Sequence, residues 1–140
     1  IWCITCIENK TKYDEDLLAE KQPEELAVYH GGFLSPQKKK LFEKLAAVAG
    51  KTMQIRFWAD IDLGGFCMFE NLQMVFPQLE PMRMEGLFVE QYHKNGLNRP
   101  EQYLQKLQEE RNAGRHPLFA DAIDKILQYG VTIEQEIFLE

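Results

Sequence analysis

Residues 53–66 read MQIRFWADIDLGGF, and this stretch indicates the fold class. Its apolar and aromatic first half, Met53–Trp58, predicts a buried strand. Two acids, Asp60 and Asp62, come directly after that strand, and Gly64-Gly65 then opens a helix. A strand that passes into a helix after a short connection is the first half of a βαβ unit.

The same alternation of strand and helix continues on both sides of this stretch. Ser35-Pro36 has the N-cap and first-turn residues that are typical of a helix start. Strands are predicted at Trp2–Ile7, Leu26–Tyr29 and Pro81–Met84, and helices at Tyr13–Glu20, from Pro36 to Gly50, and from Gly64 to Pro77. Short connections between such elements favour right-handed crossovers and a parallel sheet. We therefore expect an α/β fold, with a parallel sheet of about four strands flanked by helices.

The C-terminal part of the chain has a different pattern. Residues 86–99 are weakly patterned and are predicted to form a loop. Two helices follow at Pro100–Asn112 and Pro117–Tyr129, the second of which is strongly amphipathic. The tail Val131–Leu139 alternates like a strand, whereas Thr132-x-x-Gln135 also fits a capping box at a helix start. The sequence leaves these two interpretations of the tail open.

Composition limits the class of protein. The 140 residues carry a net charge of −6, and neither half of the chain has a basic excess. A protein that holds nucleic acid mainly by neutralising phosphates needs such an excess. Any contact with nucleic acid must therefore depend on local chemistry or come from another part of the molecule. No apolar run reaches the roughly 18 residues of a membrane span, and no signal-peptide pattern opens the chain. Neither a P-loop motif nor a dinucleotide-binding glycine motif is present.

Cysteine usage and the first residues set the context. Three cysteines cannot pair completely, so we expect reduced thiols and a cytoplasmic location. Cys3 and Cys6 lie three apart in a strand and point to opposite faces, which excludes a shared zinc ion. We expect all three cysteines to be small buried apolar residues. The chain begins in a strand without Met. We therefore treat residues 1–140 as one domain, the C-terminal part of a longer protein.

Acids follow the predicted strands at the points where they end. Glu8 follows the first strand, and Asp60 and Asp62 follow the third. Because the carboxyl ends of parallel strands meet at one edge of a sheet, these carboxylates should converge. Three converging carboxylates repel one another unless a cation is present, and oxygen ligands favour Mg²⁺ or Mn²⁺. The alternative is that Asp62 caps the next helix and that the Asp-x-Asp pair is a solvated turn.

This arrangement resembles the Toprim domain, the metal-binding module of topoisomerases, primases and related nucleases. A closer resemblance is to the C-terminal domain of the JetD family, the nuclease subunit of the bacterial Wadjet anti-plasmid system, whose Toprim domain is similar to that of the topoisomerase VI A subunit. The segments that carry it are Ile7-Glu8-Asn9-Lys10, Tyr29-His30-Gly31-Gly32-Phe33, Trp58–Phe66 and Glu134-Gln135-Glu136.

The resemblance implies Mg²⁺-dependent cleavage of double-stranded DNA by a homodimer that works with condensin-like defence subunits. A DNA-binding domain absent from these residues would position the duplex, and the nucleophile would be water or a tyrosine of that domain. Glu8, Asp60 and Asp62 would hold the metal. Glu134 and Glu136 would complete the site if the tail folds back. The alternatives are a type II topoisomerase subunit and a catalytically silent module for dimerisation or docking.

Basic residues could add contacts to DNA phosphates. His30, followed by two glycines, could bring a donor and bare backbone close to a phosphate. A tight turn with a hydrogen-bonded histidine explains it equally well. Lys38 and Lys40 lie near the start of the helix that begins at Pro36 and could touch the backbone of the duplex, although a run of three lysines is more often a solvated face.

Overall fold

The computed structural model describes residues 3–7, 25–29 and 35–139. The predicted helix Tyr13–Glu20 and the residues Glu8 and His30 lie outside these described residues. Within them, no helix is both long and apolar enough to cross a membrane.

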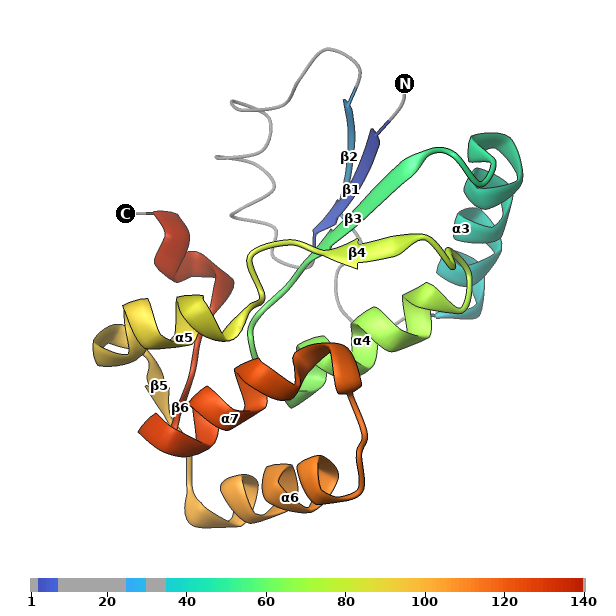
Figure 1. Cartoon of the computed structure of the whole chain (residues 1–140). Helices are drawn as coiled ribbons and strands as arrows, with labels where there is room; N and C mark the ends of the chain where they lie inside the picture. The colour runs from blue at the N-terminus through green and yellow to red at the C-terminus, as the bar shows by residue number, and fades with distance from the viewer. Residues whose placement is uncertain (1–2, 8–24, 30–34, 140) are drawn as a thin grey trace.

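Four parallel strands form one sheet in the order β2-β1-β3-β4 (Figure 1). The strands are β1 (Cys3–Ile7), β2 (Glu25–Tyr29), β3 (Gln54–Trp58) and β4 (Leu79–Pro81). All five side chains of β1 are buried, as expected for a central strand of a parallel sheet. In the register of β1 with β3, Ile7 lies opposite Trp58. The predicted α/β fold with about four parallel strands is therefore confirmed.

The fourth strand starts earlier than the sequence suggested. We predicted Pro81–Met84, whereas β4 covers Leu79–Pro81. Leu79 is buried opposite Ile55 of β3, and this burial sets the register. The backbone N–H of Met82 still donates to the carbonyl of Phe57 at 2.8 Å, after which the chain leaves the sheet.

Two helices connect the later strands. Helix α3 (Pro36–Ala49) joins β2 to β3, and α4 (Leu63–Gln73) joins β3 to β4. The Ser35 hydroxyl caps α3 by accepting from the backbone N–H of Lys38 at 3.2 Å, and Gly50 ends this helix with a φ of 73°. Both connections step across the sheet in the same direction, so right-handed crossovers place both helices on one face.

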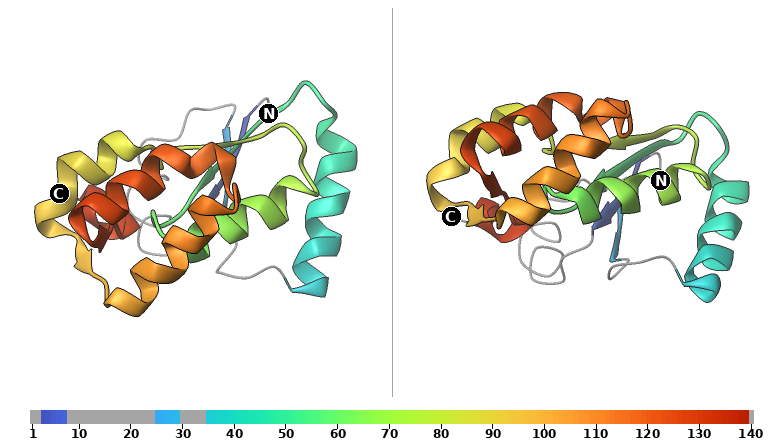
Figure 2. Two further views of the ribbon diagram at one scale, coloured as in Figure 1. Left: turned by 60° about the horizontal axis from the view of Figure 1, so that its bottom comes forward. Right: turned by 90° about the horizontal axis from the view of Figure 1, so that it is seen from below.

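The C-terminal half adds helices beyond the sheet. These elements are α5 (Gly86–Tyr92), η2 (His93–Asn95), β5 (Leu97–Asn98), α6 (Glu101–Asn112), η3 (Pro117–Phe119), α7 (Ala120–Tyr129), β6 (Val131–Thr132) and η4 (Gln135–Leu139). Figure 2 shows α3 at one end of the molecule, α5, α6 and α7 towards the other, and α4 between them. The predicted α6 is confirmed, and the helix predicted from Pro117 starts as a 3-10 turn and becomes α-helical at Ala120.

The prediction of a loop over 86–99 is wrong, because this segment contains α5. Tertiary packing specifies that helix. A Cβ on Gly86 would lie 2.4 Å from a carboxylate oxygen of Asp121 in α7, so glycine permits the close contact at the start of α5. Val89 of α5 is fully buried. One short apolar face of this kind is too brief for a periodicity argument.

The core joins the sheet to the added helices through aromatic rings. Phe66 of α4 stacks on Phe119 with ring centroids 4.5 Å apart, and Phe69 meets Phe57 of β3 edge to face at 5.7 Å. These contacts fix α4, whose first residues follow Asp60 and Asp62, between the sheet and the C-terminal helices. Each such ring adds a large buried apolar area to the core.

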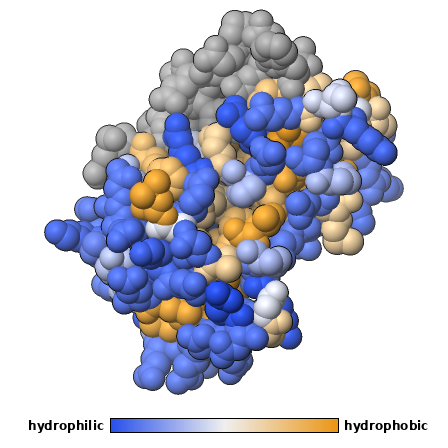
Figure 3. Space-filling model, in the orientation of Figure 1, coloured by the Kyte–Doolittle hydropathy of each residue, from blue (hydrophilic) through white to orange (hydrophobic). Residues whose placement is uncertain are grey.

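The face in Figure 3 is mostly hydrophilic, and its apolar residues form separate small patches.

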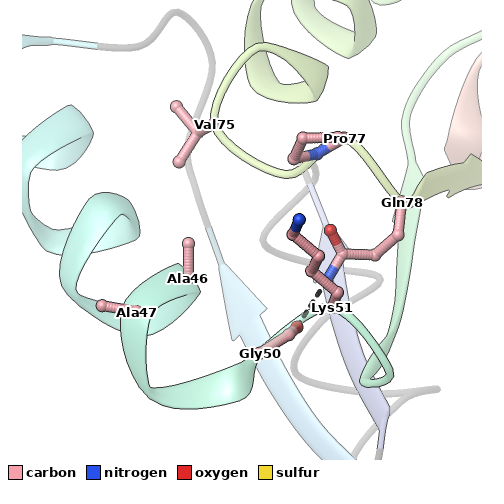
Figure 4. Close-up of a pocket in the computed structure, with 7 residues that line it drawn as sticks. All are labelled: Ala46, Ala47, Gly50, Lys51, Val75, Pro77 and Gln78. Atoms are coloured by element: carbon pink, nitrogen blue, oxygen red, sulfur yellow. Dashed lines mark hydrogen bonds between the residues drawn. The ribbon is translucent and has the colours of Figure 1, made fainter.

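The surface has a groove at the amino ends of β3 and β4. The groove has a volume of about 670 Å³, and the amide of Gln78 spans it by donating to the carbonyl of Gly50 at 2.9 Å (Figure 4). It is lined by Ala46, Ala47, Gly50, Lys51, Val75, Pro77 and Gln78. The acids predicted to bind metal follow the opposite ends of the strands.

Candidate metal centre at the carboxyl ends of the strands

The turn from β3 into α4 fixes the second acid of the Asp-x-Asp pair. Asp62 is the N-cap of α4, and its Oδ1 accepts from the backbone N–H of Gly65 at 2.7 Å. A Cβ on Gly65 would lie 2.1 Å from the carbonyl oxygen of Asp60, so only glycine fits there. The predicted capping role of Asp62 is therefore confirmed, and it orients the carboxylate.

The C-terminal tail folds back onto this turn. Ile133 and Ile61 exchange backbone hydrogen bonds of 2.8 and 3.3 Å. The backbone N–H of Gln135 donates to Asp60 Oδ1 at 2.6 Å, and its side-chain amide donates to the carbonyl of Trp58 at 3.2 Å. Gln135 itself is fully buried, which places the exposed side chains of Glu134 and Glu136 on either side of it along the tail.

Both interpretations of the tail are partly right. Val131 and Thr132 form β6, which pairs antiparallel with β5, and η4 starts at Gln135. The capping box itself is wrong, because its two side chains bind elsewhere. The Thr132 hydroxyl accepts from Arg99 Nε at 2.8 Å, and the Gln135 amide reaches β3. Tertiary hydrogen bonds replace the local pair.

The electrostatics of the turn favour a cation. The pKa of Asp60 is raised to about 6, mainly by burial and to a smaller extent by the negative charges of Asp62, Glu134 and Glu136, while the hydrogen bond from the N–H of Gln135 opposes the shift. Burial also raises the pKa of Asp62, against the N–H of Gly65 and the positive charge of Arg99. Ionised together, these acids repel one another, and an added positive charge would relieve that repulsion.

One positively charged residue lies beside these acids and was not identified from the sequence. Arg99 follows β5, and its Nη2 lies 3.7 Å from Asp62 Oδ2. Its guanidinium carbon lies 4.8 Å from the centroid of the Tyr103 ring, and the Tyr103 hydroxyl accepts from the N–H of Leu63 at 2.9 Å. No local signal marks Arg99, since the predicted loop 86–99 gave no reason to place it near Asp62.

Comparison with known proteins identifies the family of this chain. The family model described as "Wadjet protein JetD, C-terminal" matches residues 2–139. This chain belongs to that family. It is 29% identical over 138 residues to the Wadjet protein JetD of Bacillus cereus (strain Q1), an alignment that covers 97% of this chain and 33% of the relative. The chain thus spans about a third of the length of that curated relative, and membership of the JetD family implies a role in the Wadjet system.

The structure of this JetD-family domain brings some predicted site residues together and separates others. Asp60 and Asp62 lie at the strand end with Glu134 and Glu136 close enough to affect Asp60. Glu8 and His30 lie outside the described residues; Ile7, directly before Glu8, pairs with Trp58. Lys38 and Lys40 lie in the first turns of α3, at the end of the molecule away from the tail (Figure 2).

Other candidate ligands of the JetD-family domain are accounted for. Among residues 3–7, 25–29 and 35–139, no three His, Cys, Asp or Glu side chains are arranged to hold a metal ion. Cys3 and Cys6 are buried as predicted, and burial raises the pKa of Cys6 to about 12. Cys67 is only half-buried, which corrects the prediction that all three cysteines are buried.

Proposed function

We propose that this JetD-family domain is the metal-binding part of a Mg²⁺-dependent DNA nuclease of the Wadjet system. The observation that carries the proposal is the joint position of Asp60 and Asp62 at the carboxyl end of β3. Each carboxylate is oriented by a backbone N–H, and the tail adds the charges of Glu134 and Glu136. Oriented carboxylates at this edge of a parallel sheet are what a hard divalent ion requires.

The residues present fit one side of a Mg²⁺ site. The donor set contains only carboxylate oxygens, which suit Mg²⁺ or Mn²⁺ better than a softer metal. Asp60 and Asp62 would hold the ion, Glu8 would be the third ligand, and Glu134 or Glu136 would complete the set. When bound, Mg²⁺ polarises the scissile phosphate and lowers the pKa of a bound water.

The protein residues would prepare the site before the ion arrives. Asp62 holds the start of α4, and Gln135 holds Asp60 through its N–H, so neither carboxylate has to be ordered on binding. Because the pKa of Asp60 is about 6, this carboxyl would release its proton near neutral pH, and the ion would favour that release. Metal binding should therefore weaken as the pH falls below about 6.

The proposed substrate and assembly rest on the resemblance to the JetD family. The net charge of −6 makes this domain a poor holder of duplex DNA by itself. Two-thirds of the JetD relative lies outside the aligned region. That part would bind the duplex, and the homodimer and the condensin-like partners would belong to the full-length assembly.

A catalytically silent docking module is the second candidate. It is favoured by the structural work that both acids already perform, because Asp62 caps α4 and Asp60 anchors the tail. The two candidates differ in a cleavage assay. Full-length protein should cut plasmid DNA with Mg²⁺ or Mn²⁺ and stop cutting with a chelator. Asp60→Asn and Asp62→Asn should abolish cleavage, whereas Asp124→Asn, an exposed acid of α7, should not. A folded wild type that never cuts supports the silent module.

A further inference from the structure

Arg99 is held in place by contacts that do not depend on Asp62. Its Nε donates to the hydroxyl of Thr132 at 2.8 Å, and Thr132 is almost fully buried. The face of its guanidinium lies over the Tyr103 ring. Its backbone N–H donates to the carbonyl of Gly130 at 3.0 Å. The guanidinium is therefore fixed by β6 and α6.

The contact of Arg99 with Asp62 is looser than these. The Nη2–Oδ2 distance of 3.7 Å exceeds the roughly 2.7–2.9 Å of a charge-assisted hydrogen bond. The Arg99 side chain also keeps 26% of its surface exposed. Asp62 already accepts from Gly65, so the carboxylate does not need Arg99 to hold its orientation. A fixed, partly exposed guanidinium thus lies beside the acids without a short hydrogen bond to Asp62.

We infer that Arg99 binds the phosphate group of DNA at the acidic site. This inference rests on the proposed nuclease function. Asp60, Asp62, Glu134 and Glu136 would repel a phosphodiester that approaches them, and Arg99 is the cation paired with this cluster among the residues that the structure describes. A guanidinium matches a phosphate through planar, two-pronged hydrogen bonds, and one fixed beforehand loses little entropy on binding.

A purely structural role for Arg99 makes different predictions. In that case Arg99 would only tie β5 and β6 to α6, and its removal would lower stability and activity together. If Arg99 binds phosphate, a small guanidinium compound added in solution can take the place of the missing side chain. If Arg99 only connects β5 and β6 to α6, such a compound cannot restore that connection. The test must therefore separate folding, metal binding and cleavage.

The experiment measures single-turnover plasmid cleavage, Mn²⁺ binding and thermal melting of the full-length protein. Arg99→Ala should cleave about a hundredfold more slowly, the usual effect of losing one donor to developing charge. Its Mn²⁺ affinity should be unchanged or slightly higher, because a positive charge has been removed. Millimolar methylguanidinium should restore cleavage several-fold. Arg99→Lys should give an intermediate rate. Arg111→Ala, at an exposed ion pair of α6 with Asp124, is the matched control and should cleave normally.

Each other outcome has a definite meaning. If Arg99→Ala binds Mn²⁺ and cleaves at nearly the wild-type rate, Arg99 does not contact the phosphate, and the proposed nuclease function stands. If cleavage falls only in step with melting and methylguanidinium restores nothing, Arg99 is structural. If Arg99→Ala does not fold, the cleavage rate of Arg99→Lys decides. A folded Arg99→Lys that cleaves more slowly than wild type supports the assignment, and one that cleaves at the wild-type rate overturns it, because a single ammonium cannot make the two-pronged contact. Wild-type protein that neither binds Mn²⁺ nor cuts DNA removes both proposals.

Discussion

The backbone N–H of Gln135 lies 2.6 Å from Oδ1 of Asp60, a residue 75 positions earlier in the chain. This bond and the exchange between Ile133 and Ile61 attach the tail to the end of β3. They also carry Glu134 and Glu136 to the acids that follow the strand. The far C-terminus thus contributes to the electrostatics of a site formed in the middle of the sequence.

The Gln135 side chain should be worth more to stability than its size suggests. Gln135→Ala removes a buried hydrogen bond to the carbonyl of Trp58 and should lower the free energy of unfolding by about 1–2 kcal/mol. Gln78→Ala, which removes a more exposed amide bond to Gly50, should have a smaller effect. Urea denaturation of the three proteins measures both. Equal losses for the two variants would show that the Gln135 side chain does not anchor the tail.

Asp60 should make stability fall as the pH rises. Its folded pKa of about 6 lies above the ordinary aspartate value of 3.8, so the folded state holds the proton more tightly. The stabilisation from this group is complete below pH 3.8 and is lost as the pH passes 6. Asp60→Asn keeps an acceptor for Gln135 and removes the titration. The variant should therefore gain up to about 3 kcal/mol over wild type between pH 4 and pH 7, as measured by urea denaturation at each pH. A constant difference across that range contradicts the shifted pKa.

The two glycines at the start of α4 should differ sharply. Gly65→Ala would place a methyl group 2.1 Å from the carbonyl oxygen of Asp60. It should lower the free energy of unfolding by about 3 kcal/mol or more, the upper end of the usual cost of overpacking. Gly64→Ala meets only Asp62 Oδ1 at 3.5 Å, so it should be neutral or stabilising by up to about 1 kcal/mol. Thermal melting of the two variants measures the difference. A higher melting temperature for Gly65→Ala than for Gly64→Ala would contradict the packing of this turn.

A divalent ion should stabilise this chain. At about 100 times its dissociation constant, Mn²⁺ should add about 2.7 kcal/mol and raise the melting temperature. Asp60→Asn combined with Asp62→Asn should abolish that response and raise the melting temperature of the metal-free protein, because two repelling charges are gone. Differential scanning calorimetry with and without Mn²⁺ measures both effects. A melting temperature that ignores millimolar Mn²⁺ would contradict the metal site.

Glu8 should be indispensable for cleavage by the full-length protein. Glu8→Gln keeps the shape of the side chain but removes a charge and a base, so cleavage should fall by about a hundredfold or more. Lys40→Ala should change the rate several-fold at most, because it would remove one exposed phosphate contact. Single-turnover plasmid cleavage compares them, with melting curves to show that both variants fold. A fully active Glu8→Gln beside an inactive Lys40→Ala would place the catalytic centre elsewhere.

Short-range sequence patterns were sufficient to predict the strands and helix ends that their own residues specify. The apolar runs gave β1, β2 and β3, and Ser35-Pro36 and Gly50 gave the two ends of α3, because strand burial, capping and chain reversal act within a few residues. Asp60 and Asp62 were placed after β3 by the same reasoning. Their roles as metal ligands, and that of Glu8, remain predictions.

Tertiary structure decided what depends on partners distant in the sequence. Helix α5 packs on α7 where Gly86 permits a close approach to Asp121, and the tail is held at the end of β3 where Gln135 binds Asp60 and Trp58. In the folded chain, β5 pairs with β6 and Arg99, directly after β5, lies beside Asp62. By itself, the sequence therefore determined the strand–helix order and the acids at the end of β3, through short-range propensity and periodicity. The charges that surround those acids were set by hydrogen bonds that form only between segments brought together by the fold.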